Sequence, residues 1–148
     1  MKAFDPLQIL QVLDRHKVRF VVIGGIAERL WGSTTVTNDL DICYARDRGN
    51  LEMLASSLQE LKVKLRRVDR DEIRVTTVAG KLKGLESPAG SGGYDTLART
   101  ATTMDVGGVK VQVAAIEDLI RMKRAAGRPK DLIEVEVLAA VREELDRK

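Results

Sequence analysis

The chain has 148 residues, of which 44% are hydrophobic and only 3% aromatic, so it suits one domain with a mainly aliphatic core. Its formal net charge of +3 is too small to indicate nucleic-acid binding by itself, and its single cysteine excludes an internal disulfide. No stretch has the pattern of a signal peptide or the roughly 18 consecutive apolar residues of a membrane span. We therefore expect a single domain over residues 1–148, in the cytoplasm and without a membrane partner.

The first predicted element is a helix that begins at Pro6. Asp5 is a suitable N-cap, and proline suits the first helical position. The apolar spacing predicts a buried face made of Ile9, Leu10 and Leu13. His16, the only histidine, falls near the end of this helix, where exposure or a dipole interaction explains it better than catalysis. The chain therefore offers no Ser-His, Cys-His or zinc chemistry.

A buried strand and a short helix are predicted next. The apolar run Phe20–Ile23 stops at Gly24 and Gly25, which is typical of a strand that is buried on both faces. Residues 26–31 can then form a short helix that Gly32 ends.

The stretch Asp39–Tyr44 alternates strictly between polar and apolar residues up to Ile42 and is predicted to be a strand. Asp39 and Asp41 would lie on one face of it, opposite Leu40, Ile42 and Tyr44. Cys43 would share the carboxylate face, and we interpret it as a buried structural thiol.

These two carboxylates follow closely on a glycine-led helix start, and the combination indicates a metal-phosphate site. Neighbouring carboxylates repel each other unless a cation neutralises them, and Mg²⁺ binds carboxylates together with substrate phosphates. Gly24 and Gly25 allow close backbone approach, and the free N–H groups of a helix start favour an anion. The alternative is a tight turn followed by a strand with a solvated acidic face.

The middle of the chain is predicted to contain one helix, a hairpin and a loop. Residues 51–61 form a helix whose apolar face would be Leu51, Leu54, Ala55, Leu58 and Leu61. Residues 62–68 are predicted to form a strand, and residues 73–77 and 81–85 a hairpin around Ala79-Gly80. The glycine-rich segment 87–93 is predicted to be a loop.

The following residues predict a helix over Tyr94–Met104 with Leu97, Ala101 and Met104 inward, and then a small hairpin around Gly107-Gly108. Ile116, Leu119 and Ile120 mark one face of a further helix, and Lys123 continues that apolar face, which is unusual for a lysine.

Gly127 is predicted to end that helix, and Pro129 to start the last one, with Asp131 in its first turn. On the residues alone, a functional role for Lys123 and Asp131 is no better supported than a structural one. In the structural interpretation, Lys123 is a snorkelling side chain and Asp131 is favoured by the helix dipole. The last helix would bury Val135, Leu138, Val141 and Leu145.

Two motifs resemble the minimal nucleotidyltransferases of the DNA polymerase β superfamily. The first has the form G-G-x-A followed by G-S-x-x-x-T-x-D-L-D-I, and its residues are Gly24, Gly25, Ala27, Gly32, Ser33, Thr37, Asp39, Asp41 and Ile42. The second, D-L-I-x-x-K-x-A-A-x-R-x-x-D, resembles the downstream motif of AbiE-type toxin nucleotidyltransferases. The resemblance implies an α/β fold with a mixed, partly antiparallel sheet flanked by helices.

The resemblance also implies roles for individual residues. Gly24 and Gly25 would hold a nucleoside triphosphate, and Asp39 and Asp41 would be catalytic ligands of Mg²⁺ or Mn²⁺. Lys123 would contact nucleotide phosphate, and Asp131 would support the site. The acceptor would be the hydroxyl of a tRNA or of a partner protein.

One position departs from the family pattern. Relatives carry a third carboxylate in the hairpin, and this chain has Lys83 there. A lysine beside Asp39 and Asp41 can neutralise them without a metal. Glu72 or Glu86 could substitute, although Glu86 would face the opposite side of the strand from Lys83. The alternative function is therefore a catalytically degenerate member that binds a nucleotide or a protein, as a component of a toxin–antitoxin pair.

Overall fold

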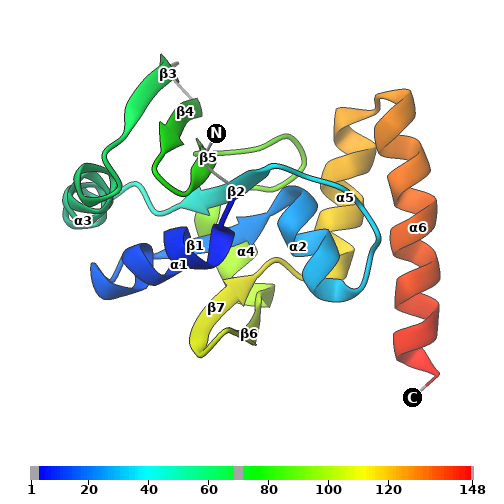
Figure 1. Ribbon diagram of the computed structural model, residues 1–148. Helices are drawn as coiled ribbons and strands as arrows, with labels where there is room; N and C mark the ends of the chain where they lie inside the picture. The colour runs from blue at the N-terminus through cyan, green and yellow to red at the C-terminus, as the bar shows by residue number, and fades with distance from the viewer. Residues whose placement is uncertain (1–3, 69–71, 148) are drawn as a thin grey trace.

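The computed structural model describes residues 4–68 and 72–147, and within them the chain forms a single seven-stranded sheet with helices around it (Figure 1). The strand order is β3-β4-β5-β2-β1-β7-β6. The strands are β1 (Phe20–Ile23), β2 (Asp39–Tyr44), β3 (Lys64–Val68), β4 (Glu72–Thr77), β5 (Gly80–Leu85), β6 (Thr102–Val106) and β7 (Val109–Val113). The helices are α1 (Pro6–Arg15), α2 (Gly24–Trp31), α3 (Arg48–Glu60), α4 (Tyr94–Thr100), α5 (Ile116–Ala126) and α6 (Pro129–Asp146).

The sheet is mixed, as predicted. The central strand β2 pairs antiparallel with β1 and parallel with β5, and β1 pairs parallel with β7. The remaining neighbours are antiparallel hairpins. This arrangement places β5 directly beside the strand that carries the two aspartates, which decides the composition of the candidate site.

The two faces of β2 are covered differently. Leu40 and Ile42 are completely buried, and Ile42 meets Leu54 of α3 in an apolar crevice. α1 contacts both α3 and β7 on this side of the molecule. The opposite face carries Asp39 and Asp41 and lies towards α5 and α6, which pack side by side at the right of Figure 1.

Both helix starts that the sequence predicts from their caps are confirmed. The Asp5 side chain accepts a hydrogen bond from the Gln8 backbone at 3.2 Å at the start of α1. α6 begins at Pro129, two residues after the left-handed Gly127 that caps α5, and Arg128 between them is its N-cap. Among the described residues, no helix has both the length and the apolar character needed to cross a bilayer.

The predicted helix over Tyr94–Met104 is too long. α4 ends at Thr100, and Met104 lies in β6, opposite Val111 of β7. Two consecutive threonines, Thr102 and Thr103, favour an extended backbone, and pairing with β7 offers it hydrogen bonds that a longer helix would forgo.

The predicted buried face of α3 is also partly wrong. Leu51 and Ala55 are exposed, whereas Asn50 and Ser57 are buried. Asn50 is held inside because its side-chain amide donates to the Ala45 carbonyl at 2.7 Å and its oxygen accepts from the Arg19 N–H. A polar residue that satisfies buried backbone groups thus faces the interior at the start of α3, and the neighbouring Leu51 faces solvent. In α6, Leu145 is exposed rather than buried.

Candidate active site

The turn from β1 into α2 lies directly against Asp41. The helix begins at Gly24, two residues earlier than predicted. Gly24 has a φ of +69°, and a Cβ atom there would lie 2.5 Å from Asp41 Oδ2. Only glycine combines this backbone conformation with such a close carboxylate. At Gly25, a Cβ atom would lie 2.8 Å from Thr37 Cβ, so this glycine packs on the loop before β2.

Asp39 and Asp41 lie on one face of β2, as the alternating pattern predicts. Each has one buried oxygen, Oδ1, without a hydrogen-bond partner in the part of the chain that the structure describes. Burial raises the pKa of Asp41, the nearby Lys83 ammonium opposes that shift, and the Asp39 carboxylate adds to it. A buried carboxylate oxygen without a donor is a favourable place for a cation.

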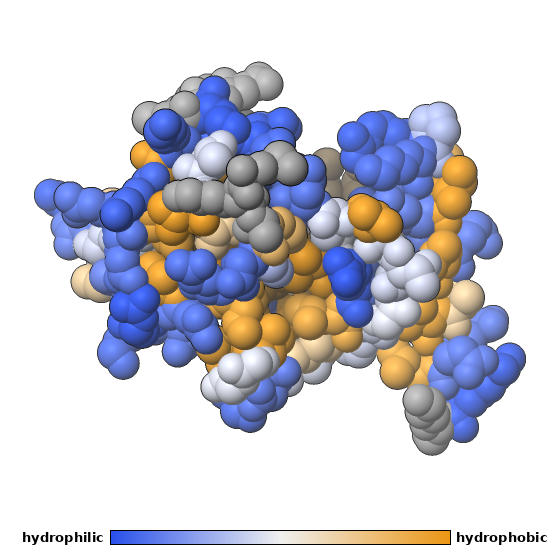
Figure 2. Space-filling view, viewed as in Figure 1, coloured by the Kyte–Doolittle hydropathy of each residue, from blue (hydrophilic) through white to orange (hydrophobic). Residues whose placement is uncertain are grey.

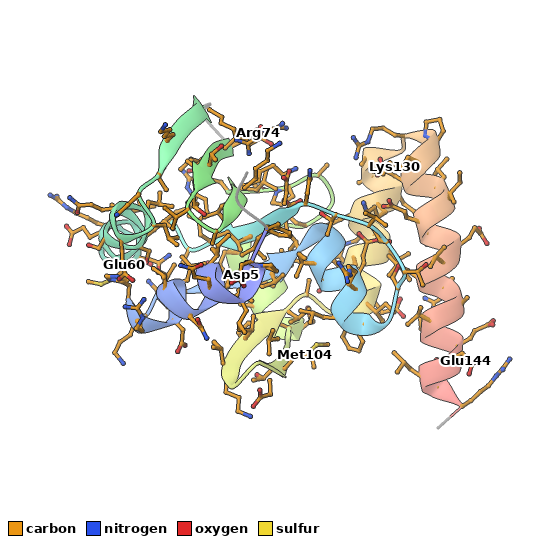
Figure 3. The ribbon with its side chains drawn as sticks, in the orientation of Figure 1. Asp5, Glu60, Arg74, Met104, Lys130 and Glu144 are labelled. Carbon is orange, nitrogen blue, oxygen red and sulfur yellow. The ribbon has the colours of Figure 1, made fainter. Side chains whose placement is uncertain are left out.

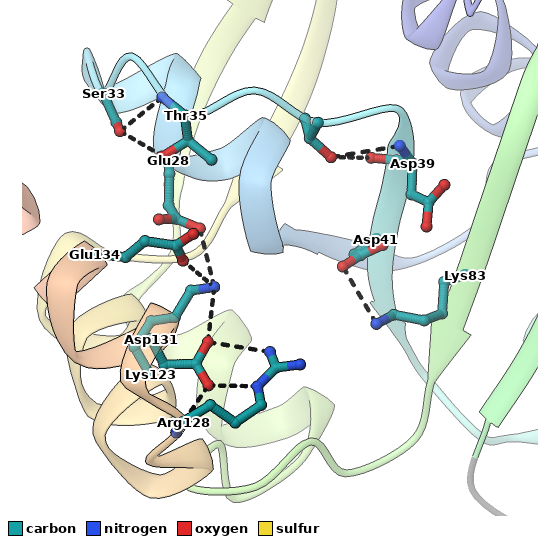
Figure 4. Close-up of polar contacts among 11 residues, drawn as sticks. Glu28, Ser33, Thr35, Asp39, Asp41, Lys83, Lys123, Arg128, Asp131 and Glu134 are labelled. Carbon is teal, nitrogen blue, oxygen red and sulfur yellow. Dashed lines mark hydrogen bonds and ion pairs between the residues drawn. The ribbon is translucent and has the colours of Figure 1, made fainter.

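Lys83 lies beside Asp41 because β5 pairs parallel with β2 in a register that places these two residues opposite each other. Lys83 Nζ is 3.6 Å from Asp41 Oδ2 (Figure 4). Neither glutamate that could have substituted joins them. Glu72 forms an ion pair with Arg74, and Glu86 forms one with Arg46 and lines a different cavity.

Lys123 points inward from α5 and is surrounded by carboxylates. Its Nζ atom lies 2.5 Å from Glu134, 3.5 Å from Glu28 and 3.5 Å from Asp131 (Figure 4). Burial alone would lower the pKa of Lys123, but the carboxylates outweigh burial, and the pKa is raised. The sequence patterns did not reveal that Lys123 has anionic partners, although the position of a lysine on an apolar face is a reason to look for them.

Glu28 is the most unusual of these partners because only 1% of its surface is exposed. Neither of its carboxylate oxygens has a hydrogen bond among the described residues, although Lys123 is close enough for an ion pair. Burial raises the pKa of Glu28, and the positive charge of Lys123 only partly compensates.

Asp131 is completely buried at the start of α6 and is fixed by Arg128. The guanidinium donates two hydrogen bonds to the carboxylate, at 2.6 and 3.0 Å, and the Arg128 backbone N–H donates a third. These contacts hold the pKa of Asp131 at about 2. Asp131 therefore caps its own helix and also supplies one of the negative charges around Lys123.

One pocket of about 160 Å³ brings most of the predicted residues together. Its polar lining comes from Asp41, Lys83, Lys123, Arg128 and Asp131, next to Gly24. An apolar wall completes it, formed by Ile23, Pro88, Ala89, Leu119, Met122 and Ala126. Asp39 and Gly25 do not line this pocket directly, although Asp39 is close enough to influence the pKa of Asp41.

The chemistry of this donor set fits a divalent cation only in part. Two carboxylates with unpaired buried oxygens suit a hard cation such as Mg²⁺. However, no group of three metal-binding side chains occurs among the residues that the structure describes. The Lys83 ammonium stands where a third carboxylate would complete such a group, and it already neutralises part of the charge of Asp41.

Comparison with solved structures identifies the fold of the chain. No protein-family model matches the chain, and no curated protein matches it in sequence. The lincosamide antibiotic adenylyltransferase LnuA, solved with lincomycin, matches with a TM-score of 0.69 at 12% identity, over 95% of this chain and 99% of LnuA. The antibiotic-resistance factor ANT(2'')-Ia matches with a TM-score of 0.62 at 15% identity, over 96% of this chain and 89% of that protein.

A third similar structure is an antigenic nucleotidyltransferase-like protein from Paracoccidioides brasiliensis. Its TM-score is 0.61 at 19% identity, over 90% of this chain and 71% of that one. At such low identities the likeness establishes the fold and nothing finer about substrates.

Proposed function

Since the chain has the nucleotidyltransferase fold, we propose that it transfers a nucleoside monophosphate from a nucleoside triphosphate to a hydroxyl group of an RNA or a protein. The observation that carries this proposal is the meeting of Gly24, Asp41 and Lys123 in one pocket. A carboxylate for a cation, a lysine for phosphate and a glycine that permits close approach are the three groups that binding of a metal triphosphate requires.

Asp39 and Asp41 are the residues that would hold Mg²⁺ or Mn²⁺, since each offers a buried oxygen without a hydrogen bond. When bound, the ion supplies charge neutralisation for the triphosphate. Lys123 would contact the phosphates from the other side of the pocket. The hydrogen bond between Arg128 and Asp131 would fix the start of α6 at the edge of the pocket.

The reaction forms a bond between the acceptor oxygen and the α-phosphorus and breaks the bond to the oxygen that bridges the α- and β-phosphates. Pyrophosphate leaves with the bonding electron pair, and the acceptor hydroxyl loses its proton. Lys83 is a poor acceptor for that proton, so the proton would leave to water. Catalysis would then rest mainly on positioning and on charge neutralisation.

The size of the pocket limits what it holds. Ligand pockets for small molecules usually measure about 300–1,000 Å³, and this pocket measures about 160 Å³. It therefore encloses only part of a nucleoside triphosphate, and the phosphates belong at its charged end beside Gly24. The remainder of the nucleotide would extend along the apolar wall towards solvent.

Transfer of label tests this proposal directly. Each of the four α-labelled nucleoside triphosphates is incubated with the protein, MgCl₂ and either total tRNA or lysate. We expect label in a macromolecule with the wild type and its loss with Asp41→Asn. Absence of transfer from all four triphosphates, together with absence of Mg²⁺-dependent triphosphate binding, would refute the proposal.

The role of Lys123 can be tested separately because Glu134 competes with phosphate for it. Removal of the Glu134 charge should free the ammonium, so Glu134→Gln should bind inorganic triphosphate with Mg²⁺ about three- to tenfold more tightly in calorimetry. Glu136→Gln is the matched control, since this glutamate is exposed on the same helix. Weaker binding by Glu134→Gln would mean that Glu134 positions Lys123 and does not compete with the ligand.

The contact of Lys83 with Asp41 favours a second candidate function, that of a nucleotide- or protein-binding module without catalysis. A resident ammonium can satisfy Asp41 in place of a metal. Such a module could serve as one component of a toxin–antitoxin pair. It would bind triphosphate and transfer nothing, and its binding would be insensitive to EDTA.

A further inference from the structure

α6 carries a second apolar surface on the side turned away from α5. Its buried side chains include Val135 and Leu138, which face α5 and the core. On the opposite side of the helix, Ile133 and Val137 are nevertheless 67% and 38% exposed. Two other exposed apolar residues of this helix, Leu132 and Leu145, project from other sides of it. Apolar surface is visible over part of α6 in Figure 2, and its C-terminal end is hydrophilic.

The exposed positions form a regular seam. It consists of Lys130, Ile133, Val137, Ala140 and Glu144, all of them exposed. Their spacing alternates between three and four residues, which is the heptad spacing of a helix that packs along another helix. A helix that is apolar on two sides is normally covered on both.

The two ends of the seam carry opposite charges, so two copies of the seam that run in opposite directions would match. Lys130 lies seven residues before Val137 and Glu144 seven residues after it, at about 10.5 Å along the axis in each direction. Figure 3 shows Lys130 and Glu144 near opposite ends of α6. A two-fold axis at Val137 would bring Lys130 of each copy to Glu144 of the other. Ile133 of each copy would meet the small Ala140.

We propose that α6 pairs in an antiparallel arrangement with α6 of a second copy of this chain. The charges select the direction, because a parallel pair would place lysine beside lysine and glutamate beside glutamate. Such a contact uses the same patch on both copies and closes on itself, as the common two-fold dimers do.

The association should be weak. Stable interfaces usually bury about 800 Å² on each partner, and a single helix seam about 21 Å long covers less than that. Glu144 already forms an exposed ion pair with Arg147 at 2.8 Å. Exposed pairs of this kind contribute little, so this one does not prevent Glu144 from pairing with Lys130 of the second copy.

Sedimentation equilibrium from low micromolar to several hundred micromolar protein tests the inference. We expect a concentration-dependent monomer–dimer equilibrium for the wild type. Val137→Glu should raise the dimer dissociation constant by at least about tenfold, because it places two like charges at the symmetry axis. Met53→Glu, on the exposed side of α3, is the matched control and should leave the dissociation constant unchanged.

Charge exchange tests the direction of pairing without an apolar substitution. Lys130→Glu and Glu144→Lys should each weaken the dimer, and the double variant should restore it to within about threefold of the wild type. A wild-type protein that stays monomeric at every concentration would overturn the proposal. So would a dimer that Val137→Glu leaves intact, or a double variant that remains as weak as the single ones.

Discussion

Replacement of Lys83 by aspartate is the most informative change at the candidate site. In Lys83→Asp, a carboxylate stands opposite Asp41 in the β2–β5 register, where an ammonium stands now. Attraction becomes repulsion between two groups that are 24% and 18% exposed in the wild type. Without metal, the variant should therefore be less stable than the wild type. Mg²⁺ should restore its stability, since three carboxylates would then face one another.

The size of the effect follows from the distance. Two unit charges at about 4 Å interact by about 4 kcal/mol at an effective dielectric constant of 20. Both side chains are partly exposed and solvent screening reduces this energy, so we expect a loss of about 2 kcal/mol in the free energy of unfolding. For a domain of this size, the melting temperature should fall by about 4–8 °C. Mg²⁺ at a hundredfold excess over its dissociation constant would raise the free energy of unfolding by about 2.7 kcal/mol.

Thermal unfolding in EDTA and in 10 mM MgCl₂ measures both effects. Lys110→Asp is the matched control because Lys110 also pairs with an aspartate, Asp105, at 3.2 Å, but on an exposed hairpin. Its free energy of unfolding should fall by less than about 1 kcal/mol, and Mg²⁺ should not raise it again. If Lys83→Asp melts like the wild type in EDTA, or if Mg²⁺ leaves it unchanged, the electrostatic account of this site is incorrect.

Three further outcomes follow from individual contacts. Gly24→Ala should lower both stability and Mg²⁺ affinity, because its Cβ atom would meet Asp41 at 2.5 Å, whereas Gly49→Ala meets nothing closer than 3.5 Å and should be neutral or stabilising in the same melts. Asp131 has a pKa of about 2, below the ordinary 3.8, so its contribution of about 2 kcal/mol should be present above pH 4 and lost towards pH 2. Asp131→Asn should be less stable at pH 7 and should lack that acid-dependent part when unfolding is followed against pH. Burial raises the pKa of Cys43 to about 12, so a thiol reagent should label it only after unfolding, and rapid labelling of the native protein at pH 8 would contradict its burial.

The sequence predicted the elements that depend on local patterns. The alternation over Asp39–Tyr44 predicts a strand, and the glycines at 24 and 25 predict a turn, without reference to the rest of the chain. The structure contains both. The nucleotidyltransferase-like fold expected from these motifs is confirmed. The assignment to the AbiE type, the nucleotide and the acceptor stay predictions.

The elements that were missed depend on contacts between distant segments. The boundary between α4 and β6 has no glycine or proline to mark it, and it is decided by pairing with β7. The carboxylates around Lys123 come from α2 and α6, so no local pattern joins them. Spacing does offer one clue, because Asp131 and Glu134 are three residues apart and therefore share a helix face.

The charges of the pocket also show why Lys83 does not by itself decide between the two candidate functions. Asp41 is paired with Lys83, and Lys123 is paired with Glu134, so both ligand-facing charges already have internal partners. A metal triphosphate would exchange these partners: the cation would replace Lys83 at Asp41, and phosphate would replace Glu134 at Lys123. A triphosphate without metal would instead have to bind between Lys83 and Lys123.

These two modes of binding differ in a measurable way. Exchange by the metal complex requires Mg²⁺, so EDTA should abolish triphosphate binding by an enzyme, and Lys83→Gln should tighten it by relieving the competition at Asp41. Binding between the two lysines requires no metal, and Lys83→Gln should weaken it because one of the two cations is lost. The sign of this one substitution therefore separates metal-dependent binding, which a transferase requires, from metal-free binding between the two lysines, even before an acceptor is known.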